Sequence, residues 1–326
     1  MKIKIFSVTF LVASSLALAC VNTTGEKSGV KCDSVCGEAV ESVDSVAVAA
    51  EPKSPYYMSG AEYTSEDSIM VERLLREAVS ERSDEHPMLY FGKKFLGVPY
   101  VAHTLENGDS EHLIVNLREM DCTTFVETVT ALTLCHRLGL TTFEDYCGQL
   151  VKVRYREGKM GDYTSRLHYF TWWGEDNERL GIVKCVFTAS KPFTAVQTLD
   201  INYMSKHPQS YKQLKAHPEF VDVIRSYERG YSGKTYRYIP KSEVGGRQSG
   251  KLGIVETGDI IAMLTSKEGL DTSHIGIAVW QDGRLHLLNA SYVYKKVVLD
   301  KHTFYDYQQR QTSQTGIRVF RVVEGL

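Results

Sequence analysis

The sequence lacks an excess of charge of either sign, because its 326 residues contain 38 Lys and Arg against 40 Asp and Glu. A formal net charge of −2 leaves no cationic surplus to neutralise phosphates, so we expect no nucleic-acid partner. Cysteine is also sparse, since seven residues over this length are too few for a disulfide-dense scaffold. Beyond the N-terminus, no segment is long and apolar enough to span a bilayer.

The N-terminus has the parts of an export signal. Lys2 and Lys4 precede an apolar run over residues 5–16, and Ala17-Leu-Ala-Cys20 supplies the small-residue pattern that signal peptidases read. We therefore expect residues 1–19 to be a signal peptide and the chain to be exported to the periplasm or the outer surface. Two processing routes remain open: simple cleavage after Ala19, or a lipoprotein signal that makes Cys20 a lipid anchor in the membrane. The second rests on a resemblance to a lipobox, although Ala17 stands where Leu is usual.

Residues 20–55 are rich in small and polar residues, which predicts a flexible tether ahead of a folded domain at 56–326. Cys32 and Cys36 lie within this tether. A metal site would need two more ligands at suitable spacing, and none is nearby. A local disulfide, or no role, fits these two cysteines better.

The order of elements in the folded part predicts an α+β domain. Helical spacing of apolar residues predicts a helix over residues 66–82 and another from about Cys122, with a strand at 112–117 between them. Residues 136–230 favour helices joined by long loops. From residue 253 onward the pattern is that of strands, at 258–264, 274–280, 285–291, 295–299 and 316–322. Helices followed by strands favour α+β over alternating βαβ units.

Cys122 has the setting of a nucleophile. It opens a helical stripe of apolar residues, and Asp121 is a plausible N-cap. The helix dipole and free amides at such a position favour a thiolate, and the same amides could receive an oxyanion. Two alternatives stay open: Cys122 could be an ordinary buried cysteine, or Thr124 and Glu127 could form the capping box and leave Cys122 just outside the helix.

A thiol nucleophile needs a histidine, and His274 opens a predicted strand that leads into a hairpin. A two-residue turn at Asp282-Gly283 fixes the strand register. In that register Asn289 is the diagonal neighbour of His274, and Gly276 leaves the space between them empty. His286 projects from the opposite face. The pattern therefore selects Asn289 to orient the imidazole, whereas a one-residue slip in the register would reverse this choice. His274 could instead be an ordinary histidine at the edge of a strand.

These motifs resemble the NlpC-type papain-like cell-wall cysteine peptidases. The resemblance rests on Asp121-Cys122-Thr-Thr-Phe-Val, Ser273-His274-Ile-Gly-Ile and Leu288-Asn289-Ala-Ser. The chain is more closely similar to the N-acetylmuramoyl-L-alanine amidase-like branch of that superfamily, through the stretches Gly97–Tyr100, Val115–Glu127, Gly161–Tyr169 and Met204–Pro208. Asn289 departs from the His of many superfamily members, although its carbonyl can still hold the ring.

The resemblance implies a papain-like core in which an antiparallel sheet packs on the nucleophile helix. It assigns Cys122 as nucleophile, His274 as base and Asn289 as orienting group. The interval of 152 residues from Cys122 to His274 exceeds what a minimal domain requires, so an inserted, mostly helical subdomain is expected at about 136–235.

Several further residues gain roles only from the resemblance. Tyr100 is expected to hold its hydroxyl near the nucleophile. The remaining implied substrate contacts come from one segment: Ser165, Arg166, His168 and Tyr169. Arg166 suits a carboxylate, but a salt bridge is its ordinary alternative. Trp172 and Trp173 could line a groove, although buried packing suits them better.

The function implied is a cysteine amidase that hydrolyses the N-acetylmuramoyl-L-alanine bond of peptidoglycan or its fragments through a thioacyl intermediate, without a metal or cofactor. One alternative is a γ-D-glutamyl-diamino acid endopeptidase that uses the same residues. A second is a wall-binding lipoprotein without catalysis, which the complete Cys122, His274 and Asn289 set disfavours.

Overall fold

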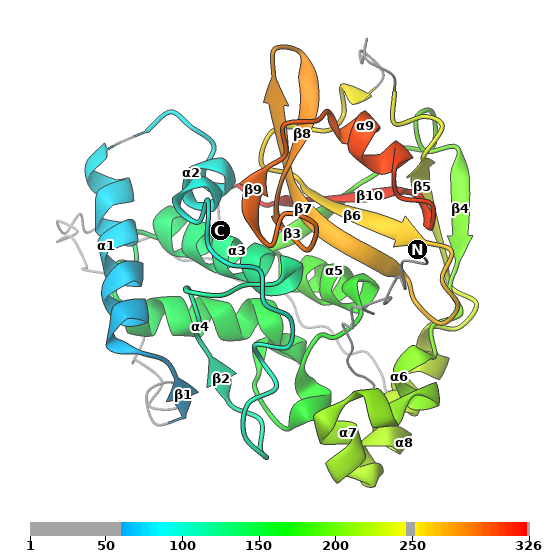
Figure 1. Cartoon of the computed structure of the whole chain (residues 1–326), viewed down its shortest axis with the longest axis horizontal. Coiled ribbons are helices and arrows are strands. Elements are labelled where there is room, and N and C mark those ends of the chain that lie inside the picture. The colour runs from blue at the N-terminus through cyan, green and yellow to red at the C-terminus, as the bar shows by residue number, and fades with distance from the viewer. Residues whose placement is uncertain (1–59, 82, 246–251, 325–326) are drawn as a thin grey trace, which may run out of the picture.

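The computed structural model describes residues 60–81, 83–245 and 252–324. Figure 1 shows helices on one side and a twisted sheet on the other, an α+β arrangement. The expected signal peptide, the tether and Cys20, Cys32 and Cys36 lie outside the described residues. Within the described ranges, no helix is both long enough and apolar enough to cross a membrane.

The first half of the folded chain is mainly helical. Its helices are α1 (Ser65–Glu81), α2 (Pro87–Lys94), α3 (Cys122–Arg137) and α4 (Phe143–Arg154). The predicted helix over 66–82 and the helix start at Cys122 are confirmed by α1 and α3. The strand expected at 112–117 is reduced to β2 (Leu113–Ile114), which pairs in parallel with β1 (Ala61–Glu62).

Strands β3 (Val183–Val186), β4 (Ala195–Thr198) and β5 (Thr235–Pro240) join five later strands in an eight-stranded sheet of the described residues. The strand order is β4-β5-β10-β6-β7-β8-β9, with β3 paired to β10. Its C-terminal strands are β6 (Ile260–Thr265), β7 (Thr272–Gln281), β8 (Arg284–Ser291), β9 (Lys296–Leu299) and β10 (Gln314–Val322). These five strands confirm the pattern predicted beyond residue 253, and every pairing among them is antiparallel. The last strand in the chain therefore sits in the interior of the sheet, beside β3, β5 and β6.

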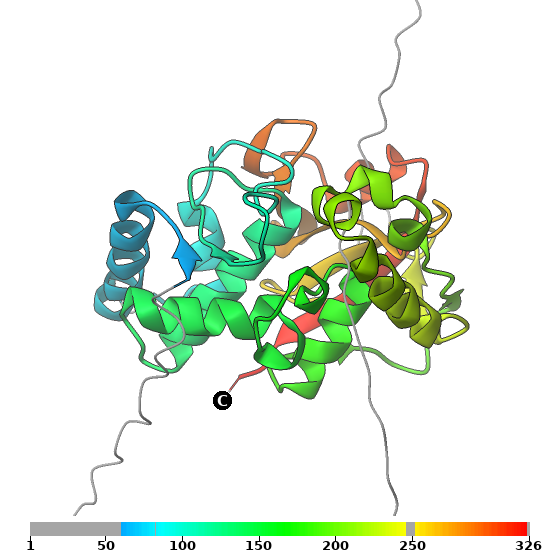
Figure 2. The same ribbon diagram turned by 90° about the horizontal axis from the view of Figure 1, so that it is seen from below.

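The middle of the chain, where a mostly helical insertion is expected at about 136–235, contains both helices and strands. It contains η1 (Arg156–Gly158), η2 (Tyr163–Ser165), α5 (Phe170–Arg179), α6 (Tyr203–Lys206), η3 (Pro208–Ser210), α7 (Lys212–Ala216) and α8 (Pro218–Tyr231). It also contributes β3 (Val183–Val186), β4 (Ala195–Thr198) and the start of β5 (Thr235–Pro240) to the main sheet. Helices α6 to α8 gather as a group, at the lower right of Figure 1 and in the right-hand half of Figure 2. The short strands were missed because their four residues are too few for a period to show.

The sheet has an apolar core on each face, and this arrangement positions the strand that carries His274. Alternate residues of β7 and β8 join a large cluster beneath α3, which packs against both strands. The opposite face packs on α9 (Phe304–Gln309) through a smaller cluster that includes Phe304 and Leu287. Trp172 and Trp173 are buried in the larger cluster, so the packing alternative holds for both.

Candidate active site

Asp121 caps the helix that begins at Cys122. Its carboxylate oxygen Oδ1 accepts hydrogen bonds from the amides of Thr123 and Thr124, at 2.9 and 2.8 Å. The Thr124 hydroxyl in turn accepts from the Asp121 amide at 3.0 Å, which completes a reciprocal capping box. The alternative cap with Glu127 is wrong, because Glu127 is buried and accepts instead from Arg154 at 2.7 Å. Cys122 is thus the first residue of the helix.

The environment of the Cys122 thiol favours its protonated form. Burial raises the pKa of the thiol to about 12, and the Asp121 carboxylate beside it acts in the same direction. The Ile275 amide, the Thr123 hydroxyl and the amide of Cys122 itself oppose this rise in pKa. Burial therefore opposes the tendency of a helix start to favour a thiolate.

The same capping geometry changes where an oxyanion could bind. The amides of Thr123 and Thr124 already donate to Asp121, so they are not open to a ligand. The amide of Cys122 is the donor of the first turn that lies next to the thiol. An oxyanion on a carbonyl attacked by Cys122 would therefore meet this amide first.

His274 and Asn289 meet as the hairpin register predicts. Strands β7 and β8 pair Trp280 with Leu285 and Ile277 with Leu288, around the turn at Asp282-Gly283. The His274 Nε2 atom lies 2.9 Å from Oδ1 of Asn289. Gly276 is needed between them, because a Cβ there would lie 3.0 Å from the Asn289 Cβ.

The two histidines of this hairpin have different partners. His286 bonds through Nδ1 to the Asp300 carbonyl, at 3.0 Å, and does not take part in the pair with Asn289. Burial lowers the pKa of His274, and the hydrogen bond to Asn289 opposes that effect only in part. A neutral imidazole whose Nε2–H donates to Asn289 has an unprotonated Nδ1, which can accept a proton.

Cys122 and His274 line one open pocket of about 320 Å³. Its walls come from the start of α3, the start of α5 and the turn that leads into β7, and the other lining residues are Thr123, Tyr169, Phe170, Leu270, Asp271, Thr272, Ser273 and Ile275. A thiol and a neutral imidazole that share a pocket can together carry out nucleophilic attack with proton transfer.

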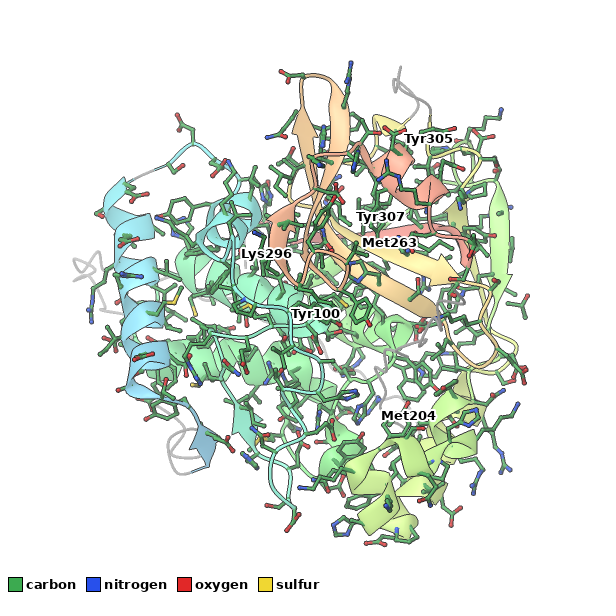
Figure 3. The ribbon with its side chains drawn as sticks, in the orientation of Figure 1. Tyr100, Met204, Met263, Lys296, Tyr305 and Tyr307 are labelled. Carbon is green, nitrogen blue, oxygen red and sulfur yellow. The ribbon has the colours of Figure 1, made fainter. Side chains whose placement is uncertain are left out.

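Two tyrosines lie close to the thiol from opposite parts of the chain. Burial raises the pKa of Tyr100, and the nearby Cys122 and Asp121 raise it further. The Tyr100 ring packs edge-on against Tyr292, with centroids 5.7 Å apart, and lies near the centre of the view in Figure 3. The expectation of a tyrosine beside the nucleophile agrees with this placement.

Tyr307, the second tyrosine, was not predicted. Burial raises its pKa, a hydrogen bond with Gln314 lowers it, and the neighbouring Cys122 raises it. Its ring centroid lies 6.4 Å from that of His274. Tyr307 belongs to α9, whose six residues are too few to show a helical period.

The other predicted contacts are divided by the structure. Tyr169 lines the pocket, and its hydroxyl donates to Glu228 at 2.8 Å. Arg166 lies outside the pocket lining and is buried, with its guanidinium donating to both carboxylate oxygens of Glu111 at 3.0 and 2.7 Å and to Glu106 at 3.0 Å. The salt-bridge alternative thus describes Arg166, because its donors are already used by carboxylates of this chain.

Ser165 and His168 also lie outside that pocket lining and have intramolecular partners. The Ser165 hydroxyl donates to the Asp162 carbonyl at 2.6 Å and accepts from the Gly161 amide at 2.9 Å. The buried His168 bonds through Nε2 to the Tyr163 carbonyl at 2.9 Å. Both residues hold the turn that precedes α5, which begins at the pocket.

The described residues contain neither a candidate metal-binding cluster nor a disulfide. The described residues contain no group of three or more His, Cys, Asp or Glu side chains that could hold a metal ion. Four described cysteines are free thiols: Cys122, Cys135, Cys147 and Cys185. Cys135 and Cys147 are buried away from the pocket lining.

Comparisons with known proteins agree on one family. The N-acetylmuramoyl-L-alanine amidase-like family matches residues 90–317. A crystal structure of an N-acetylmuramoyl-L-alanine amidase from Bacteroides uniformis is 43% identical, with a TM-score of 0.68 over 73% of this chain and 97% of that one. A Bacteroides fragilis protein named as a proposed xylanase is also 43% identical, with a TM-score of 0.66 over 71% of this chain and 98% of that one.

More distant similarity extends only to the fold. A Legionella pneumophila protein is 21% identical, with a TM-score of 0.60 over 79% of this chain and 95% of that one. No curated protein matches the chain. The family match spans well over half of the sequence and contains Cys122, His274 and Asn289. The chain belongs to the N-acetylmuramoyl-L-alanine amidase-like family.

Proposed function

We propose that this protein is a cysteine amidase that hydrolyses the bond between N-acetylmuramic acid and L-alanine in peptidoglycan or muropeptides. The hydrogen bond of 2.9 Å between His274 and Asn289, beside a pocket shared with Cys122, is the observation that carries the proposal. Membership of the amidase-like family supports the choice of substrate.

The mechanism follows from the protonation states of the pair. His274 removes the thiol proton as the Cys122 sulfur attacks the lactoyl carbonyl carbon, and the carbonyl π electrons move to oxygen. The amide of Cys122 donates a hydrogen bond to that oxyanion. His274 then returns the proton to the alanine nitrogen, and the C–N bond breaks to leave a thioester. Water, deprotonated by His274, hydrolyses the thioester and releases the thiol.

The pocket suits this chemistry better than glycoside hydrolysis. Glycosidases use, in most families, a pair of carboxylates on either side of the glycosidic bond. Asp271 is the sole carboxylate that lines the pocket with Cys122 and His274, within the part of the chain that the structure describes. The pocket therefore does not favour the xylanase activity named for one structural relative.

The proposal extends to fold family and location. The nucleophile helix packed on an antiparallel sheet that carries His274 and Asn289 supports an NlpC-type papain-like core. The N-terminal sequence supports export and a lipid at Cys20, which would hold the enzyme at the membrane near its peptidoglycan substrate. Substitution Cys20→Ser should abolish incorporation of labelled palmitate, and continued incorporation would exclude this anchor.

Digestion of defined muropeptides, read by mass spectrometry, tests the activity. The wild-type protein should release sugar that lacks peptide, and Cys122→Ala should release none. Cys135→Ala is the matched control, because it removes a buried thiol from the same helix outside the pocket lining, and should keep activity. Sugar that retains L-Ala-D-Glu would indicate the endopeptidase instead. Intact substrate after incubation with wild-type protein would contradict both enzymes and favour a binding protein.

A further inference from the structure

Asp271 is almost fully buried, yet one of its carboxylate oxygens accepts no hydrogen bond from the described residues. The residue is 2% exposed. Its Oδ2 accepts a hydrogen bond from the amide of Thr171, in the first turn of α5, at 2.6 Å. No described residue donates to Oδ1, and this oxygen is not one of the fully buried polar atoms without a partner, so it remains accessible. Asp271 thus has one oxygen fixed by the protein and one available.

The available oxygen belongs to a residue that lines the reactive pocket. Asp271 stands in the wall formed by residues 270–275, together with His274 and opposite the start of α3. Thr272, the next residue, lines the same pocket, and its hydroxyl is buried without a hydrogen-bond partner among the described residues. Two adjacent polar groups therefore lack protein partners at one wall, and the buried Thr272 hydroxyl is costly to leave unpaired unless a ligand satisfies it.

A buried arginine lies near Asp271. Arg318 is 3% exposed and donates through Nη2 to the Thr171 hydroxyl, whose backbone amide donates to Asp271. Burial lowers the pKa of Arg318, and Asp271 is the first of the groups that counteract it. The nearby cation reduces the attraction of Asp271 for an ammonium ion and leaves the carboxylate able to accept a hydrogen bond from a neutral group.

We propose that Asp271, assisted by Thr272, forms a specificity subsite that accepts a hydrogen bond from a neutral N–H or O–H group of the substrate. The donor would be an amide or hydroxyl that flanks the scissile bond, because the same pocket holds Cys122 and His274. This inference rests on the proposed amidase function. A substrate without the donor would cover this carboxylate oxygen and leave it without a hydrogen bond, which is how such sites reject close analogues.

Steady-state kinetics with N-acetylmuramoyl-L-alanyl-D-isoglutamine test the subsite. Asp271→Asn keeps an acceptor for the Thr171 amide and turns an NH2 group toward the pocket. It should raise KM about ten- to a hundredfold. The kcat and the rate of Cys122 alkylation by iodoacetamide should change less than about twofold, because a contact that is equally strong in the bound ground state and in the transition state affects KM alone. Thr272→Val should raise KM about three- to tenfold by the same reasoning.

Thr171→Val is the control for a purely structural role. It removes the hydroxyl that binds Arg318 but keeps the amide that binds Asp271, so it should lower the melting temperature and leave KM near wild type. An unchanged KM in Asp271→Asn would overturn the subsite, and so would an equal rise in KM in Thr171→Val. If Asp271→Asn does not fold, an unchanged KM in Thr272→Val would overturn it. Intact substrate with wild-type protein would contradict the proposed function itself, and the subsite with it.

Discussion

Replacement of Asn289 by Ala should reduce turnover without abolishing it. The side chain is 1% exposed, and its Oδ1 lies 2.9 Å from His274 Nε2. The Asn289→Ala variant leaves the Nε2–H group of His274 without this acceptor, a loss worth about 1–3 kcal/mol. If the transition state carries this whole loss, kcat falls about five- to 150-fold. The larger value is expected, because the hydrogen bond strengthens when His274 becomes a cation during attack.

The assay separates orientation of the base from loss of the fold. We expect kcat on muramyl dipeptide to fall while KM stays within about twofold, and the alkylation rate of Cys122 by iodoacetamide to fall in parallel. Asn177→Ala is the matched control, because Asn177 is also buried but donates to the carbonyls of Val153 and Trp173 and lies outside the pocket lining. This control should lose stability and keep kcat. A wild-type kcat in Asn289→Ala would refute the orienting role.

Two further predictions concern the thiol and the buried ion pair. Because burial raises the pKa of Cys122 to about 12, the thiolate fraction should rise steadily from pH 6 to 9, and the alkylation rate of Cys122 should rise with it. Peptide mass spectrometry measures this rate, and a plateau across the range would indicate a preformed thiolate–imidazolium pair. Glu127→Ala leaves the buried Arg154 cation without its carboxylate partner and should lower the free energy of unfolding by about 3–5 kcal/mol. Glu268→Ala breaks an exposed pair with Lys206 and should cost under about 1 kcal/mol in the same urea titration.

The parts of the site that local rules govern were predictable from the sequence. A two-residue turn and the alternation of strand side chains were enough to pair His274 with Asn289 and to set His286 aside. Asp121 before an apolar helical stripe was enough to place Cys122 at a helix start. Both inferences use spacings of a few residues, where backbone geometry leaves little choice.

The parts that depend on distant partners were not predictable. Arg166 was expected to bind substrate, but its carboxylate partners Glu111 and Glu106 lie 55 and 60 residues earlier in the chain. The pKa of Cys122 depends on burial, which no helix-start argument supplies. Tyr307 and Asp271 reach the site only because α9 and the turn before β7 fold against it. Tertiary packing, rather than local pattern, decides such contacts.

The interior position of β10 means that the sheet around the reactive pocket is completed only after Cys122 and His274 have been synthesised. A ribosome-bound chain that ends before Gln314 has β6 and β7 but lacks the strand that joins them to β3 and β5. Arg318, which lies near Asp271, is on that same strand. Chains that end before β10 therefore carry Cys122 and His274 without Arg318 and without the central strand of the sheet. The thiol and the imidazole are thus synthesised before the strand on which the sheet around their pocket depends.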